Sequence, residues 1–163
     1  MSSKAPIVYQ VAWVSLLIQV ALIGLFSLLF FLVTTDTNLS AILGCMVTLA
    51  LVMVLRQTLA RYHRQGIRLT KAGRFADAIP QFEKSLSFFT KYQKIDQFRS
   101  ITLLSSSRMC YREMALCNMA FCHSQIGNGV LARKYYEEVL TQYPTNTVAK
   151  AALNLMNAEK QRL

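Results

Sequence analysis

The sequence predicts an all-α protein in which a two-helix transmembrane hairpin precedes a domain of helical repeats. Residues 5–35 contain no charged side chain, and a second uncharged run covers residues 37–55. The remainder of the chain is different, because charged residues are frequent there, apolar residues recur at helical spacing, and two stretches resemble each other. We therefore divide the chain into a hairpin, residues 1–56, and a domain, residues 57–163.

Each uncharged run is long enough to cross a lipid bilayer as a helix. A helix rises about 1.5 Å per residue and the hydrocarbon layer is about 30 Å thick, so roughly 20 apolar residues suffice. We expect the spans at about residues 7–33 and 39–56. In the interior of the hairpin the polar residues are Gln19 and several Ser and Thr, with no ionisable group, so the hairpin shows no sign of a transport pathway or proton relay.

A stripe of small residues in the second span indicates how the hairpin packs. Ala41, Gly44 and Thr48 recur at helical spacing. Small side chains let two helix backbones approach closely within a membrane. We expect this stripe to face the first span.

The distribution of positive charge predicts the topology of the hairpin. Net charge is +10, and Lys4 is the only basic residue before Arg56. The connection between the spans has no Lys or Arg, whereas six basic residues follow the second span within about 20 positions. Because cytoplasmic flanks of membrane helices are enriched in Lys and Arg, both termini are expected in the cytoplasm. Topology accounts for the basic excess, so no nucleic-acid partner is expected. The compact hairpin fits a bacterial inner membrane, with an organelle membrane as the alternative.

Two stretches of the domain share residue types at the same spacing. A small residue precedes a glycine by seven positions, an alanine follows that glycine by five, and an aromatic residue and a leucine come four and eight positions later. The matched positions are Gly66/Ala120, Gly73/Gly127, Ala78/Ala132, Phe82/Tyr136 and Leu86/Leu140. In a pair of antiparallel helices the small residues suit a close approach, and the glycine suits a left-handed helix end.

This pattern resembles the tetratricopeptide repeat (TPR), a helix–turn–helix unit of about 34 residues. The resemblance implies an α-solenoid of about two repeats, at about residues 59–92 and 113–146. Pro144 follows the second repeat and cannot continue its helix. The first repeat departs from the family pattern, with Thr90 in place of the terminal proline and Gln65 where an apolar residue is usual.

The segment between the repeats, residues 93–112, is an insertion that the TPR pattern does not contain. Asp96 is a suitable helix N-cap, so we expect an extended inter-repeat helix, in which the first helix of the second repeat begins at about Gln97. Alternatively, the three serines 105–107 mark a break, because serine has low helix propensity. Residues 147–163 carry apolar residues at helical spacing and are expected to form a capping helix. Because about three repeats are normally needed for stability, a homo-oligomer is a reasonable expectation.

Residue types needed for catalysis or metal binding form no recognisable motif. His63 and His123 are 60 residues apart, and Cys117 and Cys122 lie about 140° apart around a helix. The four cysteines lack a metal-binding spacing. We therefore expect no enzymatic activity, no catalytic residue, no metal and no cofactor.

Two sets of residues are candidates for binding. TPR arrays bind peptides or protein segments on a concave surface formed mainly by the first helix of each repeat, and the resemblance implies such a groove here. Its candidate residues are Arg64, Arg68, Asn118, Phe121 and Gln125. Four basic residues also recur every three or four positions on one helix face, where they either attract anionic lipid at about 1 kcal/mol each or serve only as a topology signal. This basic stripe consists of Arg61, Arg64, Arg68 and Lys71.

The expected function is that of a membrane-anchored TPR adaptor or scaffold, which holds an unidentified protein partner at the cytoplasmic face of the membrane. Two alternatives stay open. In the first, the chain is an accessory or regulatory subunit whose hairpin packs against a larger membrane complex. In the second, it is a surface module whose basic stripe recognises anionic lipid.

Overall fold

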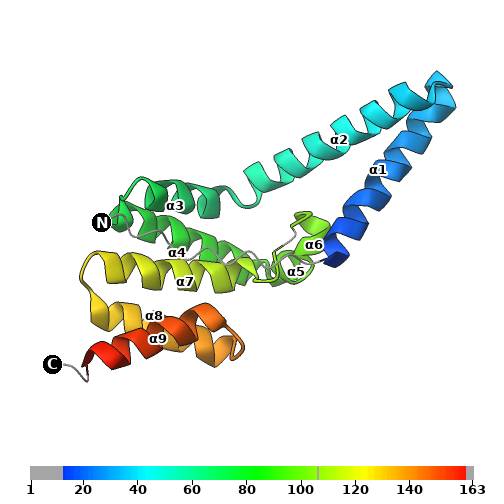
Figure 1. Cartoon of the computed structure of the whole chain (residues 1–163). Coiled ribbons are helices and arrows are strands. Elements are labelled where there is room, and N and C mark those ends of the chain that lie inside the picture. Colours follow the sequence, from blue (N-terminus) through cyan, green and yellow to red (C-terminus); the bar gives the residue numbers. More distant parts are fainter. Residues whose placement is uncertain (1–12, 106, 161–163) are drawn as a thin grey trace. The chain divides into compact units, whose positions relative to one another are not determined.

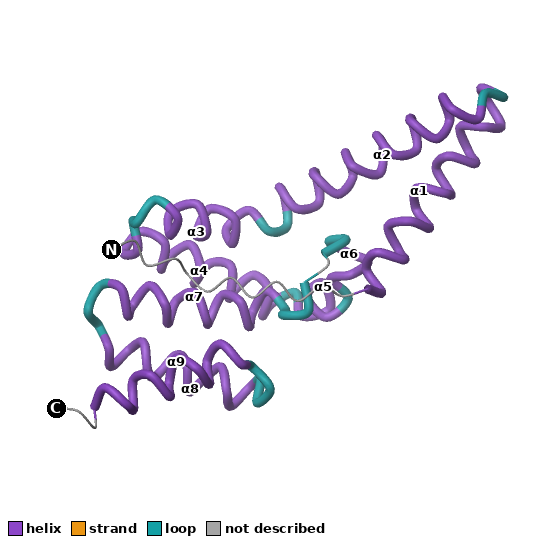
Figure 2. Tube along the Cα trace, viewed as in Figure 1, coloured by secondary structure: helices purple, strands orange, loops and turns teal. Residues whose placement is uncertain are grey.

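The computed structural model describes residues 13–105 and 107–160, and these residues form helices joined by turns and loops, with no strand (Figure 2). They group into two compact units, which are described separately. Of the described residues, the hairpin unit contains 13–61 together with the segment from 93 to 108, and the domain unit contains 62–92 and those from 109 onward. The insertion thus groups with the hairpin by its contacts, although it lies within the domain along the chain.

Nine helices make up the described part of the chain (Figure 1). The hairpin unit contains α1 (Trp13–Thr34), α2 (Thr37–Thr58), α5 (Gln93–Gln97) and α6 (Arg99–Thr102). The domain unit contains α3 (Arg61–Lys71) apart from its first residue, together with α4 (Phe75–Lys91), α7 (Tyr111–Gln125), α8 (Gly129–Gln142) and α9 (Thr147–Lys160).

Helices α1 and α2 are both long and apolar enough to span a membrane. They run antiparallel and are joined by a short turn (Figure 1). At this turn Thr35 has a φ of 55°, and the Asp36 carboxylate begins α2 by accepting the N–H groups of Asn38 and Leu39 at 2.8 and 3.1 Å. The two predicted spans are therefore present as helices, while residues 7–12 of the first lie outside the described residues.

A close backbone approach holds α1 and α2 together. The buried residues of α2 are Ser40, Gly44 and Thr48, which lie four residues apart on one face. A Cβ atom added to Gly44 would lie 2.3 Å from Ser27 Oγ and 2.7 Å from Ser27 N in α1. The predicted stripe is thus correct at Gly44 and Thr48 but wrong at Ala41, which is exposed because Ser40 occupies the buried position one turn before Gly44.

The domain unit is a stack in which α4, α7, α8 and α9 each pack against the next (Figure 1). Two glycines turn the chain: Gly73, between α3 and α4, has a φ of 74°, and Gly127, between α7 and α8, has a φ of 80°. Residues with side chains are strained at these angles, so the backbone requires glycine where the repeat pattern has it. Residues 59–92 contain the antiparallel pair α3 and α4, and residues 113–146 contain nearly all of α7 and α8.

The core of the domain unit forms where small and large side chains meet between helices. Phe82 is fully buried, and a Cβ added to Gly66 would lie 2.6 Å from its ring, so α3 approaches α4 closely at this point. Ala78, Ala120 and Ala132 are also fully buried. Small residues thus occupy the positions of close approach, with aromatic rings filling the space beside them.

The predicted extension of α7 back to Gln97 is wrong. Helix α7 begins at Tyr111, and the sulfur of Cys110 caps it by accepting the Glu113 N–H at 3.4 Å. Asp96 is not at the start of a helix, because it lies within the short helix α5. Its side chain is completely buried.

The break between α6 and α7 has a local cause. Leu103 and Leu104 are buried, and Leu104 has a φ of 47°, which no residue of a right-handed helix adopts. An uninterrupted helix therefore cannot pass through this position. Of the two predictions for the insertion, the break near the serines is the correct one.

The predicted capping helix is present as α9, which packs against α8. Its first turn is fixed by Asn146, whose side-chain oxygen accepts the Ala149 N–H at 2.7 Å while its amide donates to Glu113 of α7 at 2.7 Å. Residues 161–163 of the predicted cap lie outside the described residues.

Candidate functional site

The five predicted groove residues come from two helices of the domain unit. Arg64 and Arg68 lie on α3 and are exposed. On α7, Asn118 and Phe121 are half-buried and Gln125 is exposed. Arginine side chains at such positions are free to meet carboxylates of a bound segment.

Contacts between α3 and α7 place the two helices side by side. The rings of His63 and Tyr111 meet edge to face with centroids 5.1 Å apart, and the Thr70 hydroxyl lies 3.6 Å from the Cys122 sulfur. The structure thus brings together the helices that carry the candidate residues. Phe121 is partly committed within the fold, because its ring packs edge to face against Phe75 of α4.

The predicted basic stripe lies on an exposed face of α3. All four of its members are exposed, namely Arg61, Arg64, Arg68 and Lys71. The opposite face carries His63 and Gly66, which are buried against the rest of the domain unit. The spacing of three and four residues therefore separates a cationic surface from a packed one.

His63 is buried among aromatic rings. It lies edge-on to Phe82 and Tyr111, with centroids 5.6 and 5.1 Å away. Burial disfavours the charged imidazolium and lowers the pKa of His63 from 6.5 to about 4. The ring is therefore neutral at physiological pH and acts as a packing element of the α3–α4–α7 contact.

The cysteines of α7 are held as thiols. Burial raises the pKa of Cys117 to about 12, and the nearby Glu113 carboxylate acts in the same direction. Burial also raises the pKa of Cys122. A thiol, unlike a thiolate, is a poor nucleophile and a poor metal ligand. In the described part of the chain no three His, Cys, Asp or Glu side chains converge as a metal site would require.

An open cleft that the sequence did not indicate lies over α7 between α4 and α8. Its volume is about 530 Å³. Leu86 and Met119 contribute apolar surface, and Glu83, Lys91 and Glu138 contribute charge. Further lining residues are Ser87, Thr90 and Tyr135. Burial raises the pKa of Tyr135, and the two glutamates add to the effect.

A second feature that the sequence did not indicate joins the insertion to both α1 and α2 of the hairpin unit. The side-chain amide of Gln19 and the guanidinium Nη2 of Arg56 each donate a hydrogen bond to the Leu104 carbonyl oxygen, both at 2.8 Å. We call this arrangement the clasp. Leu104 is held in a left-handed conformation that costs about 1–2 kcal/mol, which the two hydrogen bonds help to offset. The available signal was the amide of Gln19 in the interior of an uncharged run.

The insertion is also tied together internally. Arg99 donates from Nε to the Ser107 carbonyl at 3.1 Å, from Nη1 to the Asp96 carbonyl at 3.4 Å, and from Nη2 to the Arg108 carbonyl. The Thr102 hydroxyl donates to the Ile95 carbonyl at 2.8 Å. These bonds satisfy the backbone where the short helices α5 and α6 end.

Comparisons of this chain with protein-family models, with curated proteins and with solved structures give no match.

Proposed function

We propose that this chain is a membrane-anchored scaffold, in which the α1–α2 hairpin crosses a bilayer twice and a TPR-like domain unit binds a segment of another protein. The observation that supports this proposal combines the apolar helices of the hairpin unit with the helix pairs of the domain unit. Two apolar helices of spanning length are joined to a domain of two antiparallel helix pairs, and Gly66, Gly73 and Gly127 have the roles that the repeat pattern predicts. Its mechanism is binding without chemistry.

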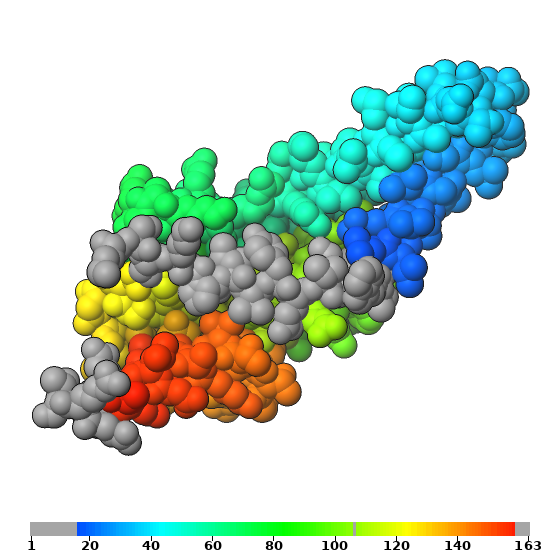
Figure 3. All heavy atoms as spheres, in the orientation of Figure 1, coloured from blue at the N-terminus to red at the C-terminus, as the bar shows by residue number. Residues whose placement is uncertain are grey.

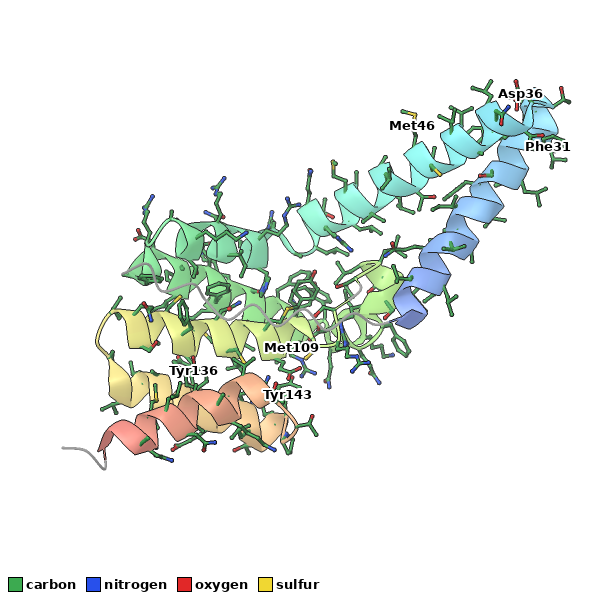
Figure 4. The ribbon with its side chains drawn as sticks, in the orientation of Figure 1. Phe31, Asp36, Met46, Met109, Tyr136 and Tyr143 are labelled. Carbon is green, nitrogen blue, oxygen red and sulfur yellow. The ribbon has the colours of Figure 1, made fainter. Side chains whose placement is uncertain are left out.

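Exposed apolar side chains on both spans support membrane insertion. Leu17, Leu32 and Val33 of α1 are 70%, 72% and 82% exposed, and Leu49 of α2 is 66% exposed. Met46 also points away from α1 (Figure 4). Atoms of α1 and α2 lie against each other near the turn (Figure 3), and apolar side chains make up much of the exposed surface of both helices. Surfaces of this kind are unfavourable in water at about 25 cal/mol per Å² and suit a lipid environment.

The charge distribution supports a topology in which both termini are cytoplasmic. The turn between α1 and α2 carries Asp36 and no basic residue, whereas Arg56 and the basic stripe of α3 follow the second span. In this proposal the domain unit is cytoplasmic and the membrane is a bacterial inner membrane.

The partner that suits this surface is an acidic protein segment. Arg64 and Arg68 are exposed and one helical turn apart, which allows two carboxylates to bind along α3. Asn118 and Gln125 add amide groups from α7, which can bond to the backbone of an extended chain.

Charge reversal in the full-length protein tests this proposal. Partners are captured by chemical crosslinking of the protein in native membranes and identified by mass spectrometry. The double variant Arg64→Glu/Arg68→Glu is expected to lose the major partner. The matched control, Lys84→Glu/Lys134→Glu, also reverses two exposed charges, but on α4 and α8, and is expected to retain it. Retention of every partner by the first variant would rule out these arginines as the binding site.

A lipid-binding role for α3 is a second candidate, because all four residues of the basic stripe are exposed. It is tested by hydrogen–deuterium exchange of the full-length protein in nanodiscs with and without phosphatidylglycerol. Slower exchange of α3 in the anionic nanodiscs supports this role. Equal exchange in both lipids argues against it.

A further inference from the structure

We propose that the insertion is a third membrane-contacting element, in which residues 98–105 lie at the inner boundary of the apolar layer and Phe98 and Ile101 insert among lipid chains. The inference rests on the proposed membrane insertion of α1 and α2. It goes beyond that proposal, because the insertion has no apolar run of spanning length and belongs to the domain along the chain.

The clasp fixes the depth of the insertion. Gln19 lies 15 residues before the end of α1 at Thr34, and Arg56 lies 19 residues after the start of α2 at Thr37. At about 1.5 Å per residue, the two donors are about 22 and 28 Å from the hairpin turn. An apolar layer is about 30 Å thick, so both donors and the Leu104 carbonyl that they share lie near the boundary opposite the turn.

The clasp also supplies hydrogen-bond partners that this depth requires. A side-chain amide within the apolar layer has no water available, and leaving it unpaired is costly. Gln19 finds its partner in the Leu104 carbonyl, which is itself buried. The insertion therefore supplies the acceptor that the amide of Gln19 needs. For that reason the Leu104 segment must lie at the same depth as Gln19 and Arg56.

Within residues 98–105 the exposed side chains are those of Phe98 and Ile101, and both are apolar, whereas the exposed polar residues Lys94, Gln97 and Arg108 lie on either side of this stretch. Phe98 is 53% exposed and Ile101 is 61% exposed, and their spacing of three residues puts them on one side of the helical turn. Arg99, the cation within this stretch, donates its hydrogen bonds to backbone carbonyls of the insertion. Figure 1 shows α6 beside the end of α1 that is far from the turn, and the two helices contact each other. The apolar face is thus continuous with the apolar surface of the span, which identifies lipid as its occupant.

Quenching of tryptophan fluorescence by brominated lipids tests the inference in the full-length protein reconstituted into phosphatidylcholine vesicles. The natural chain has one tryptophan, so Trp13→Phe gives a silent background. Phe98→Trp reports on the insertion, Leu29→Trp on the half of α1 nearer the turn, and Val130→Trp is a matched control at an exposed apolar residue of α8. We expect quenching of Phe98→Trp to be several-fold stronger than that of Val130→Trp, and strongest with bromines near the headgroup end of the acyl chain.

The controls separate the possible failures. If Leu29→Trp is quenched and Phe98→Trp behaves like Val130→Trp, the inference is wrong while the membrane anchor stands. If neither Leu29→Trp nor Phe98→Trp is quenched, the anchor and the inference both fail. Blue-shifted emission of Phe98→Trp without lipid quenching, together with crosslinks between copies, means that a second copy covers this face instead.

Two further variants keep the test decisive. Ile101→Trp reports on the same face and is used if Phe98→Trp fails to fold. Gln19→Leu removes one donor of the clasp and is expected to reduce the quenching of Phe98→Trp at least twofold. The control, Leu25→Ala, changes an exposed residue of the same span and is expected to leave the quenching unchanged. Unchanged quenching in Gln19→Leu would show that the clasp does not position the insertion.

Discussion

Gly44 makes the packing of the two spans sensitive to a single methyl group. In Gly44→Ala the added Cβ would lie 2.7 Å from the backbone nitrogen of Ser27 and 3.0 Å from its Cα. Because these are backbone atoms, no side-chain rotation relieves the contact, and α1 and α2 must move apart by about 1 Å to restore ordinary van der Waals distances. Overpacking of this kind costs about 1–3 kcal/mol.

The matched control is Gly24→Ala. A Cβ at Gly24, in the middle of α1, meets no atom within 4 Å, so this change adds helix propensity without a clash. For both variants, the full-length protein in mixed micelles is titrated with sodium dodecyl sulfate. Separation of α1 from α2 is detected as a loss of energy transfer between fluorescent amino acids placed at the exposed positions Val20 and Met53. We expect separation of the spans at a lower detergent fraction in Gly44→Ala and no such shift in Gly24→Ala.

A second-site change tests whether the backbone of Ser27, and not its side chain, causes the clash. Ser27→Ala removes the hydroxyl that lies 2.3 Å from the added Cβ but leaves the Ser27 backbone in place. The double variant Gly44→Ala/Ser27→Ala should therefore remain destabilised. Full rescue would mean that a movable side chain causes the clash and that the backbones of the two spans are not in close contact.

Three further predictions concern the domain unit. Gly66→Ala brings a Cβ within 2.6 Å of the Phe82 ring and is expected to cost about 1–3 kcal/mol and lower the thermal midpoint, whereas Gly129→Ala, which meets no atom within 4 Å, is tolerated. Because the pKa of His63 falls from 6.5 to about 4 on folding, the unfolded chain binds a proton more readily than the folded chain. About 3 kcal/mol of the stability present above pH 6.5 is therefore lost as the pH falls toward 4. The variant His63→Phe is expected to show a weaker pH dependence of the free energy of unfolding, measured by denaturant titration. Cys117, buried with a pKa of about 12, should resist iodoacetamide until the protein is unfolded, as measured by mass spectrometry.

Local chemistry explains which parts of the fold were predictable. The spans follow from long uncharged runs, which need no knowledge of the rest of the chain. The turns at Gly73 and Gly127 follow from the ability of glycine to adopt a positive φ. Asp36 begins α2 by bonding to N–H groups only two and three residues away. Each of these signals lies within a few residues of the structure that it produces.

The prediction of an extended helix in the insertion was wrong because the conformation there depends on distant residues. No glycine or proline interrupts residues 97–110, so helix propensity alone favours a continuous helix. The left-handed Leu104 is fixed by donors 85 and 48 positions earlier in the chain, which no local pattern reveals. The contact of Phe121 with Phe75 also depends on distant residues, since it arises only when α4 packs on α7. The cleft at Glu83 and Glu138 likewise exists only once α4 and α8 stand on either side of α7.

The long separation between the members of the clasp has a consequence for biosynthesis. The ribosome adds Leu104 48 residues after Arg56, and at about 5–20 residues per second this takes about 2–10 s. During that interval both spans have been synthesised, yet the amide of Gln19 still lacks its eventual acceptor. The hairpin therefore reaches its final hydrogen bonding only after a large part of the following polypeptide has been translated, and a nascent chain truncated before residue 104 would carry an incompletely satisfied pair of helices.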